Sequence, residues 1–421
     1  MTGHPHTRSV TRRAFVRSGA LAMFSLGVAP PFLARAAAAG QFAPAGGSRP
    51  LLVTIFQRGA VDGLNMVVPH AEGAYYAARP SIAIAPPGAA DGAINLDGTF
   101  GLHPRLAPLA GLWANGSLAV VHACGSHDPT RSHFDAQDFM ESATPGDKTT
   151  QDGWLNRYLQ AGLVADPLRG VAVTAAMPRA LAGTGAALSM AAISRFDLFG
   201  NPGAVQALKT AYLQSSNAQF RQTAAEAFEA IDDLAAIVGA SYQPAGGAVY
   251  PESPLGWALR DIAQLAKAEV GLEVAFAETT DWDHHVNEGG ATGALAGRLD
   301  DLARAIAALA TDLGPRMADT VILTMSEFGR TVAENGNGGT DHGHGNAMLV
   351  AGGPVRGGQV YGAWPGLAPA SLYQGRDLAV TTDFRDVFAE VLTRHLGLGA
   401  GWMAQVLPGF TPSAPPGLLD S

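Results

Sequence analysis

The sequence contains little cysteine and little charge. Of its 421 residues only Cys124 is a cysteine, and 15% are charged. A single thiol can form neither an internal disulfide bond nor a cysteine-rich zinc site, so any metal would have to be held by histidine, aspartate and glutamate. The 47% hydrophobic content excludes a disordered chain and is sufficient for a large core.

Positive charge is also scarce, because the formal net charge is -9. The first 39 residues hold five of the 27 basic residues and no acid, which leaves 22 basic against 36 acidic residues and a charge of -14 for the rest. Such a surface repels nucleic acid and anionic lipid, so we expect no nucleic-acid partner. An anionic substrate would need a local positive centre such as a metal ion.

Long hydrophobic runs are absent except near the N-terminus. There the basic segment Thr11–Arg17, with Arg12 and Arg13, precedes an apolar stretch from Ser18 to Leu33 and the small residues Ala36–Ala39. This pattern is typical of a twin-arginine signal peptide, and the stretch is short for a membrane anchor. We expect residues 1–39 to direct the chain to the twin-arginine export machinery, with a periplasmic or secreted product and no stable membrane insertion.

Apolar, β-rich runs alternate with segments of helical composition in the remaining chain. This alternation predicts an α/β fold with a mostly parallel central sheet and helices on both faces. We expect residues 40–421 to form a single domain with a helical insertion around 204–270. The predicted strands are 51–56, 118–123, 272–277, 320–324 and 347–351, and the predicted helices are 106–112, 205–237, 255–270, 299–313 and 384–395.

Histidines and aspartates gather in the loops beside these strands. Ligands of parallel sheets bind beyond the carboxyl ends of the strands, where such loops meet. Mixed imidazole and carboxylate groups favour zinc, manganese or iron over calcium, and a structural hydrogen-bond network is the alternative. The histidine pairs are His127 and His133, His284 and His285, and His342 and His344; the acids are Asp62, Asp128, Asp135, Asp281, Asp283, Glu327 and Asp341.

The segment Asp128–Asp135 predicts a loop that becomes a helix. Helix N-termini bind oxyanions, and Arg131 could hold a phosphate or sulfate group in a bidentate manner. A hydroxyl of Thr130 or Ser132, ionised by a nearby metal, would be a competent nucleophile. The alternative is that these hydroxyls only cap the helix.

Six short motifs are spread along the chain after residue 40. They are Arg58–Asn65, Arg131–Gln137, Asp152–Leu155, Trp282–His285, Ser326–Arg330 and Gly339–Gly345. Together these motifs resemble the DUF1501 family of exported bacterial proteins. That family in turn resembles the alkaline phosphatase and sulfatase superfamily, which implies an alkaline phosphatase-like fold with two metal sites beside a hydroxyl or modified cysteine nucleophile.

The resemblance implies a metal-ligand set residue by residue. Phe328 departs from the pattern, because the superfamily has a metal-binding histidine after the acid at the position of Glu327. The resemblance therefore implies that one metal site is missing, is weakened, or is completed by a residue from elsewhere, such as His133 or His344. The implied ligands are Asp62, Asp283, His285, Glu327, His342 and His344, which would hold one or two divalent ions, with zinc or manganese favoured and calcium or magnesium as alternatives.

The nucleophile region of the resemblance falls on Thr130 and Ser132. His127 stands where a sulfatase has its modified cysteine, so we do not expect a formylglycine enzyme. We expect Ser132, Thr130, Arg131 and His133 to form the catalytic group. The predicted activity is metal-dependent hydrolysis or transfer of a small anionic phosphate or sulfate ester, and the alternative is a non-catalytic secreted protein that binds a metal or an anion.

Overall fold

The computed structural model describes residues 49–162, 167–193, 242–413 and 415–420, together with 210, 214 and 237. The predicted signal peptide lies outside the described residues. The part of the predicted insertion between 204 and 241 also lies outside them, apart from residues 210, 214 and 237. This part includes the helix expected at 205–237.

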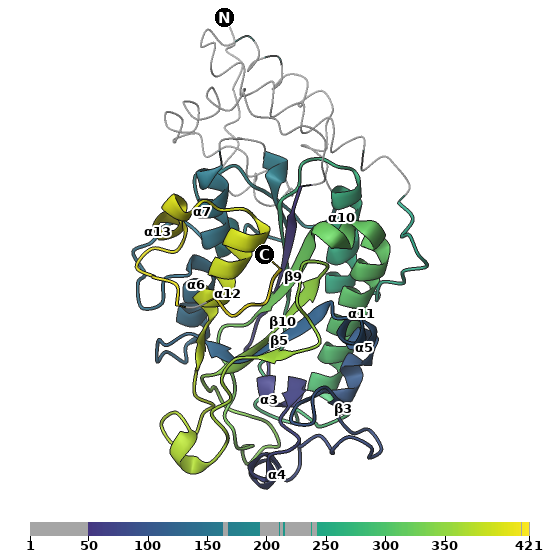
Figure 1. The fold of residues 1–421 in the computed structure, drawn as a ribbon, viewed down its shortest axis with the longest axis vertical. Coiled ribbons are helices and arrows are strands. Elements are labelled where there is room, and N and C mark those ends of the chain that lie inside the picture. The colour runs from purple at the N-terminus through teal and green to yellow at the C-terminus, as the bar shows by residue number, and fades with distance from the viewer. Residues whose placement is uncertain are drawn as a thin grey trace, which may run out of the picture.

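A nine-stranded sheet runs through the middle of the molecule (Figure 1). Its order is β11-β5-β10-β9-β1-β8-β6-β7, and β12 pairs with β5 beside this path. Strand β1 pairs in parallel with both β8 and β9. The strands are β1 Leu51–Gln57, β5 Leu118–Gly125, β6 Gly170–Val173, β7 Leu188–Met190, β8 Val274–Thr279, β9 Thr320–Met325, β10 Asn346–Gly352, β11 Val360–Tyr361 and β12 Thr382–Asp383.

One strand of this sheet, β10, runs against its neighbours. It pairs antiparallel with β5, where Asn346 lies opposite Cys124, and antiparallel with β9, where Val350 lies opposite Leu323. The beginning of β10 therefore lies beside the carboxyl ends of the other strands. A loop that enters β10 reaches the same edge as loops that leave β5, β8 and β9.

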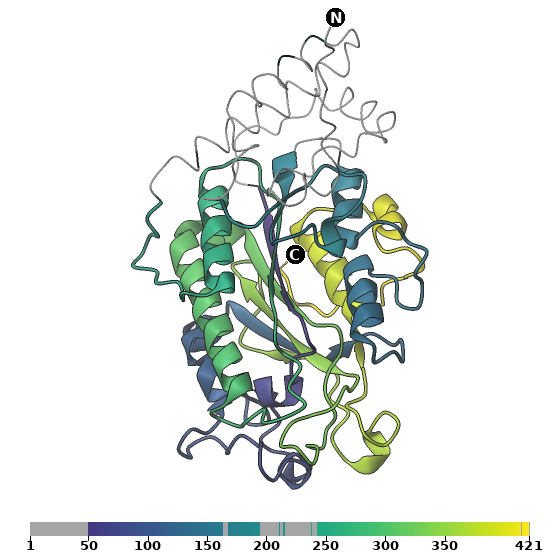
Figure 2. The same ribbon diagram turned by 180° about the vertical axis from the view of Figure 1, so that it is seen from behind.

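Helices cover both faces of the sheet, as predicted. Helices α5, α10 and α11 lie on one side, and α6, α7, α12 and α13 lie on the other (Figure 1 and Figure 2). The alternation of β1 explains both layers, because Val53 and Ile55 join one buried cluster while Leu52 and Phe56 join the other. The helices are α5 Ala110–Ala114, α6 His133–Ser142, α7 Trp154–Ala161, α10 Pro254–Lys267, α11 Ala294–Leu313, α12 Phe384–Glu390 and α13 Met403–Val406.

The small elements between β1 and β5 were not predicted. Strands β2 Val67–Val68, β4 Gly101–Leu102 and β3 Ile94–Asn95 form a separate antiparallel sheet in the order β2-β4-β3. Two short helices accompany them, α3 Gly63–Met66 and α4 Gly73–Ala78. The stretch expected to be helical at 106–112 is divided between a 3₁₀ helix, Pro104–Leu109, and α5.

The last predicted helix begins and ends close to the predicted residues. Asp383 caps α12 by accepting a hydrogen bond from the backbone N–H of Arg385, and a π-helical turn, Val391–His395, continues the helix. In the portion of the chain that the structure describes, the helices are all too short or too polar to cross a membrane.

Candidate metal centre

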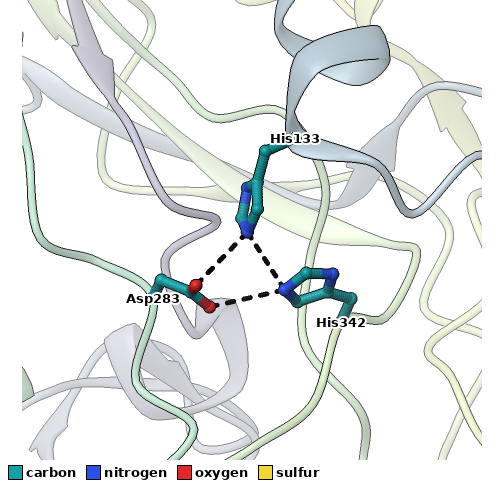
Figure 3. Close-up of side chains that lie close together, drawn as sticks. All are labelled: His133, Asp283 and His342. Carbon is teal, nitrogen blue, oxygen red and sulfur yellow. Dashed lines mark hydrogen bonds and ion pairs between the residues drawn. The ribbon is translucent and has the colours of Figure 1, made fainter.

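Three side chains from separate parts of the chain meet at the carboxyl edge of the central sheet. His133 begins α6 after β5, Asp283 follows β8, and His342 precedes β10 (Figure 3). Their ligand atoms all lie within 4.8 Å of one another. The Nε2 atom of His133 is 3.0 Å from Nε2 of His342 and 3.5 Å from Oδ2 of Asp283, and Nε2 of His342 is 3.4 Å from Oδ1 of Asp283.

His285 adds a further donor beside His342 and Asp283. Its Nε2 atom lies 2.9 Å from Nε2 of His342 and 3.0 Å from Oδ1 of Asp283. We call His133, Asp283, His285 and His342 the histidine–aspartate cluster. The side chains of Asp283 and His285 are 43% and 40% exposed, so one face of the cluster is open to solvent.

The other ring nitrogen of each histidine faces an oxygen that can only accept. Nδ1 of His133 lies 2.8 Å from the carboxylate of Glu327, Nδ1 of His285 lies 3.0 Å from the carboxylate of Asp341, and Nδ1 of His342 lies 2.8 Å from the carbonyl of Arg131. We therefore assign the proton of each neutral ring to Nδ1.

This assignment leaves three Nε2 lone pairs and a carboxylate directed at one another. Lone pairs at 2.9 to 3.0 Å repel unless a proton or a cation lies between them. Histidine ligands of metals are held in the same way, with the second ring nitrogen bonded to a carboxylate or a carbonyl. The donor set therefore fits a divalent cation, and its three imidazoles suit zinc or manganese better than calcium or magnesium.

The charged groups around the cluster shift its proton affinities in opposite directions. The hydrogen bond to Glu327 raises the pKa of His133. Burial lowers the pKa of His342, and the positive charges of Arg330 and of His133, when that ring is protonated, lower it further, so His342 is neutral. Burial alone would raise the pKa of Asp283, but the hydrogen bond and charge of Arg330 lower it below its usual range, so Asp283 is an anion.

Arg330 holds the loops of the cluster together. Its guanidinium is buried and donates to the carboxylate of Asp283 at 2.7 Å. It also donates to the backbone carbonyls of Ala60, Trp282 and Thr340. Arg330 belongs to the sequence motif Ser326–Arg330. Its role in joining the loops was not predicted, because the sequence does not show that these loops are adjacent.

Glu327 lies behind the cluster, where it contacts His133 and not the convergence point. Its Oε1 atom accepts from Nδ1 of His133, from Nε2 of Gln137 at 2.9 Å and from the backbone N–H of Gly59 at 2.8 Å. Burial would raise the pKa of Glu327, but these bonds lower it. Phe328 follows as a buried wall, with its ring centroid 5.1 Å from those of both His133 and His342.

Asp62 is placed in a separate buried ion pair. Both of its carboxylate oxygens accept from the guanidinium of Arg79, and Oδ1 also accepts from the backbone N–H of Leu64 as the cap of α3. Burial opposes ionisation, but Arg79 keeps the pKa of Asp62 below its usual range. Glu288 lies beside this pair, and burial and the charge of Asp62 raise its pKa well above the usual range.

His344, the remaining predicted ligand, is also outside the cluster. Its ring stacks on that of Tyr373, with centroids 4.1 Å apart. Burial lowers its pKa to about 4, so the ring is neutral. Of the six predicted metal ligands, the structure therefore brings Asp283, His285 and His342 together, and His133 from the predicted catalytic group joins them.

The remaining predicted catalytic residues form the loop that precedes α6. Ser132 caps α6 by accepting from the backbone N–H of Asp135 at 3.5 Å, and the hydroxyl of Thr130 accepts from the backbone N–H of Ser132 at 3.2 Å. The guanidinium of Arg131 donates to the carboxylate of Asp377, while its carbonyl holds His342. The loop thus positions two histidines of the cluster, and both hydroxyls have local structural partners.

A comparison with family profiles gives one match, to a family described as a protein of unknown function, DUF1501, over residues 49–408. The chain belongs to the DUF1501 family. All four residues of the histidine–aspartate cluster fall within the matched region. Searches of curated proteins and of solved structures returned no match.

Proposed function

We propose that this DUF1501 protein binds one divalent cation, zinc or manganese, at the histidine–aspartate cluster and hydrolyses or transfers a phosphate or sulfate ester. The observation that carries the proposal is the convergence of the Nε2 atoms of His133 and His342 with the carboxylate of Asp283, with His285 beside the last two. A tetrahedral ion bound at about 2.1 Å sets its ligand atoms about 3.4 Å apart. The ligand atoms of His133, Asp283 and His342 are 3.0 to 3.5 Å apart, and Nε2 of His285 lies 2.9 to 3.0 Å from those of His342 and Asp283.

The surroundings of the cluster support an anionic substrate. When bound, a divalent ion would act as a Lewis acid toward the phosphoryl or sulfuryl oxygens of an ester. A cavity of about 550 Å³ borders Asp283 and His284 and includes Arg298 and the first turn of α11. It offers room for the ester beside a ligand. Its lining includes the N-terminus of α11 and Arg298, but Arg298 pairs with the lining residue Asp281 at 2.8 Å, so the bound ion would supply the positive centre for the ester.

The candidate nucleophiles remain the hydroxyls of Ser132 and Thr130. Ser132 immediately precedes His133, so its hydroxyl is attached to the backbone that carries a ligand. Both hydroxyls accept a backbone hydrogen bond, and neither donates one to a described residue. Each therefore keeps a proton that could be removed when the oxygen attacks the ester.

The wider resemblance belongs to the same proposal. A relationship to the alkaline phosphatase superfamily is supported by a mostly parallel sheet with a metal-binding cluster at its carboxyl edge. Export through the twin-arginine machinery to the periplasm or the medium is supported by Arg12 and Arg13 ahead of an apolar stretch. Changing both arginines to lysine should retain the protein in the cytoplasm, and unchanged export would contradict this part.

A non-catalytic metal-binding protein is the second candidate, and two observations favour it. Four protein ligands already complete a tetrahedral zinc site, as in structural zinc centres. The local hydrogen bonds of Thr130 and Ser132 are those of a helix cap. The exposed face of Asp283 and His285 favours the enzyme, because a fifth ligand could approach from that side.

Turnover measurements separate the two candidates. The zinc- and manganese-loaded proteins are assayed on phosphate monoesters, phosphate diesters and sulfate esters. We expect hydrolysis of at least one class, a loss of activity of 10²-fold or more in the double variant Thr130→Ala, Ser132→Ala, and unchanged metal content in that variant. Stoichiometric metal without turnover of any class would support the non-catalytic candidate instead.

A further inference from the structure

We propose that a second cavity beside the cluster binds an apolar group of the substrate, so that the ester is one of a hydrophobic alcohol or phenol. This inference rests on the proposed function and adds a substrate class to it. The cavity has a volume of about 610 Å³ and lies between α4 and the segments 331–335 and 367–376. In Figure 1, α4 and the yellow-green segment around Pro369–Ser371 lie at the same end of the molecule.

The walls of this cavity are mainly apolar. They include Ala74 and Ala78 from α4, Val332, Leu367 and Leu372. All five of these side chains belong to or pack against one hydrophobic cluster, so the walls are backed by a packed layer. Moving methylene groups from water into such surroundings is favourable, so these walls favour an aliphatic chain or a ring over a sugar.

The polar groups of the lining are already engaged in the protein. Both carboxylate oxygens of Glu334 accept from the segment at Ser81, including its backbone N–H. The amide of Asn335 donates to the carbonyl of His285 and to the carboxylate of Asp341. Few groups remain for the hydroxyls of a sugar, and no aromatic ring among the described lining residues offers a stacking surface for a base.

Two lining residues connect the cavity to the cluster. Asp341 accepts from Nδ1 of His285 at 3.0 Å, and Arg376 donates to the carbonyl of His342. The wall of the cavity is therefore the layer that directly supports two ligands. An alcohol part bound in this cavity would therefore lie across Asp341 and Arg376 from the two ligands.

Charge and exposure support an amphiphilic occupant. Arg376 is 43% exposed and forms an ion pair with the fully buried Asp377, whose carboxylate also pairs with Arg131. Among the residues that the structure describes, Arg376 is nevertheless the one basic residue of a lining that also contains Glu334 and Asp341, so the anionic head group would lie at the cluster and only the apolar part in the cavity. Phe134 and Val286, which are 91% and 55% exposed, directly follow two ligand histidines in the chain, so apolar surface also lies close to the cluster.

Binding of hexyl phosphate and methyl phosphate tests this inference by calorimetry on the full chain, both zinc-loaded and treated with EDTA. We expect hexyl phosphate to bind at least tenfold more tightly than methyl phosphate in both forms, because the cavity contains no metal ligand. The variants Ala78→Trp and Leu372→Asp, which fill or charge the cavity from opposite walls, should reduce the preference to less than twofold. Ala107→Trp, on an exposed side chain elsewhere, should retain it.

Equal affinity for the two phosphates, or a preference that survives both cavity variants, would overturn the inference. The outcome is separate from that of the proposed function. A hexyl preference without turnover of any ester would leave the cavity assigned and refute the hydrolase. Turnover without a hexyl preference would support the hydrolase and refute the assignment of the cavity.

Discussion

Glu327 orients the ring of His133 although its carboxylate does not reach the centre of the cluster. Glu327 is 1% exposed. One of its carboxylate oxygens accepts three hydrogen bonds, and one of these comes from the ring of His133. A carboxylate behind an imidazole makes the ring a stronger ligand and sets which nitrogen faces the metal. The sequence indicated an acid at this position, but it did not distinguish a ligand from a supporting residue.

Replacing Glu327 by glutamine should weaken metal binding about 10- to 100-fold, because the amide can still accept from His133 but carries no charge. Competition with a fluorescent zinc chelator measures the change. Glu252→Gln, on an exposed side chain, is the matched control and should bind the ion as the wild type does. An affinity unchanged by Glu327→Gln would show that the carboxylate does not support the site.

Asp62 illustrates where inference from sequence fails at single residues. An acid directly after the first strand suggests a ligand, and its position at the sheet edge was predicted correctly. Its partner Arg79 lies 17 positions further on, at the end of a short helix that gives no clear periodic signal. An arginine in bidentate contact already balances the charge of Asp62, so this carboxylate does not require a metal.

Two buried histidines tie the small sheet and its loops to the rest of the protein. On β5, Nδ1 of His122 accepts from the backbone N–H of Ala123, and Nε2 donates to the carbonyl of Val67 at the start of β2. His103 accepts from the backbone N–H of Arg105 and donates to the carbonyl of Gly290. Burial lowers the pKa of each ring to about 4.

These histidines predict a loss of stability in acid. In the unfolded chain they titrate near 6.5, so between about pH 6.5 and 4 the unfolded state binds more protons than the folded state. Stability is full above pH 6.5 and falls as the pH approaches 4, by about 3 kcal/mol from His122 alone. Urea denaturation at several pH values, with EDTA present to exclude metal loss, measures the slope.

His122→Gln should make that slope shallower, because glutamine can form similar hydrogen bonds but does not titrate. His70→Gln, at a ring that bonds to the exposed Asn95, is the matched control. An identical pH dependence in wild type and His122→Gln would contradict the explanation.

Long apolar elements were predictable and short ones were not. The five predicted strands and the helices at 255–270, 299–313 and 384–395 correspond to observed elements with shifts of a few residues. Strands β2, β3 and β4 have two residues each, too few for a periodic pattern. The direction of β10 was not predictable either, since a fully buried strand has the same continuous apolar pattern in both directions.

At the scale of the whole molecule, the cluster depends on the fold bringing distant loops together. His133 and His342 are 209 positions apart, yet their Nε2 atoms are separated by 3.0 Å. The sequence predicted that these loops would meet at one edge of the sheet. Because β10 is antiparallel to β5 and β9, its first residue lies at that edge, and so does the loop that carries His342. Which of the predicted ligands meet depended on side-chain packing, such as that of His344 on Tyr373.

Metal content of the purified protein tests the central claim most directly. We predict one zinc or manganese ion per chain by elemental analysis, and less than a tenth of that in His342→Ala and in Asp283→Asn. Asp62→Asn and His70→Ala should retain the ion when folded. A wild-type protein that binds no divalent ion at micromolar concentration, or a His342→Ala variant that keeps a full equivalent, would contradict the account.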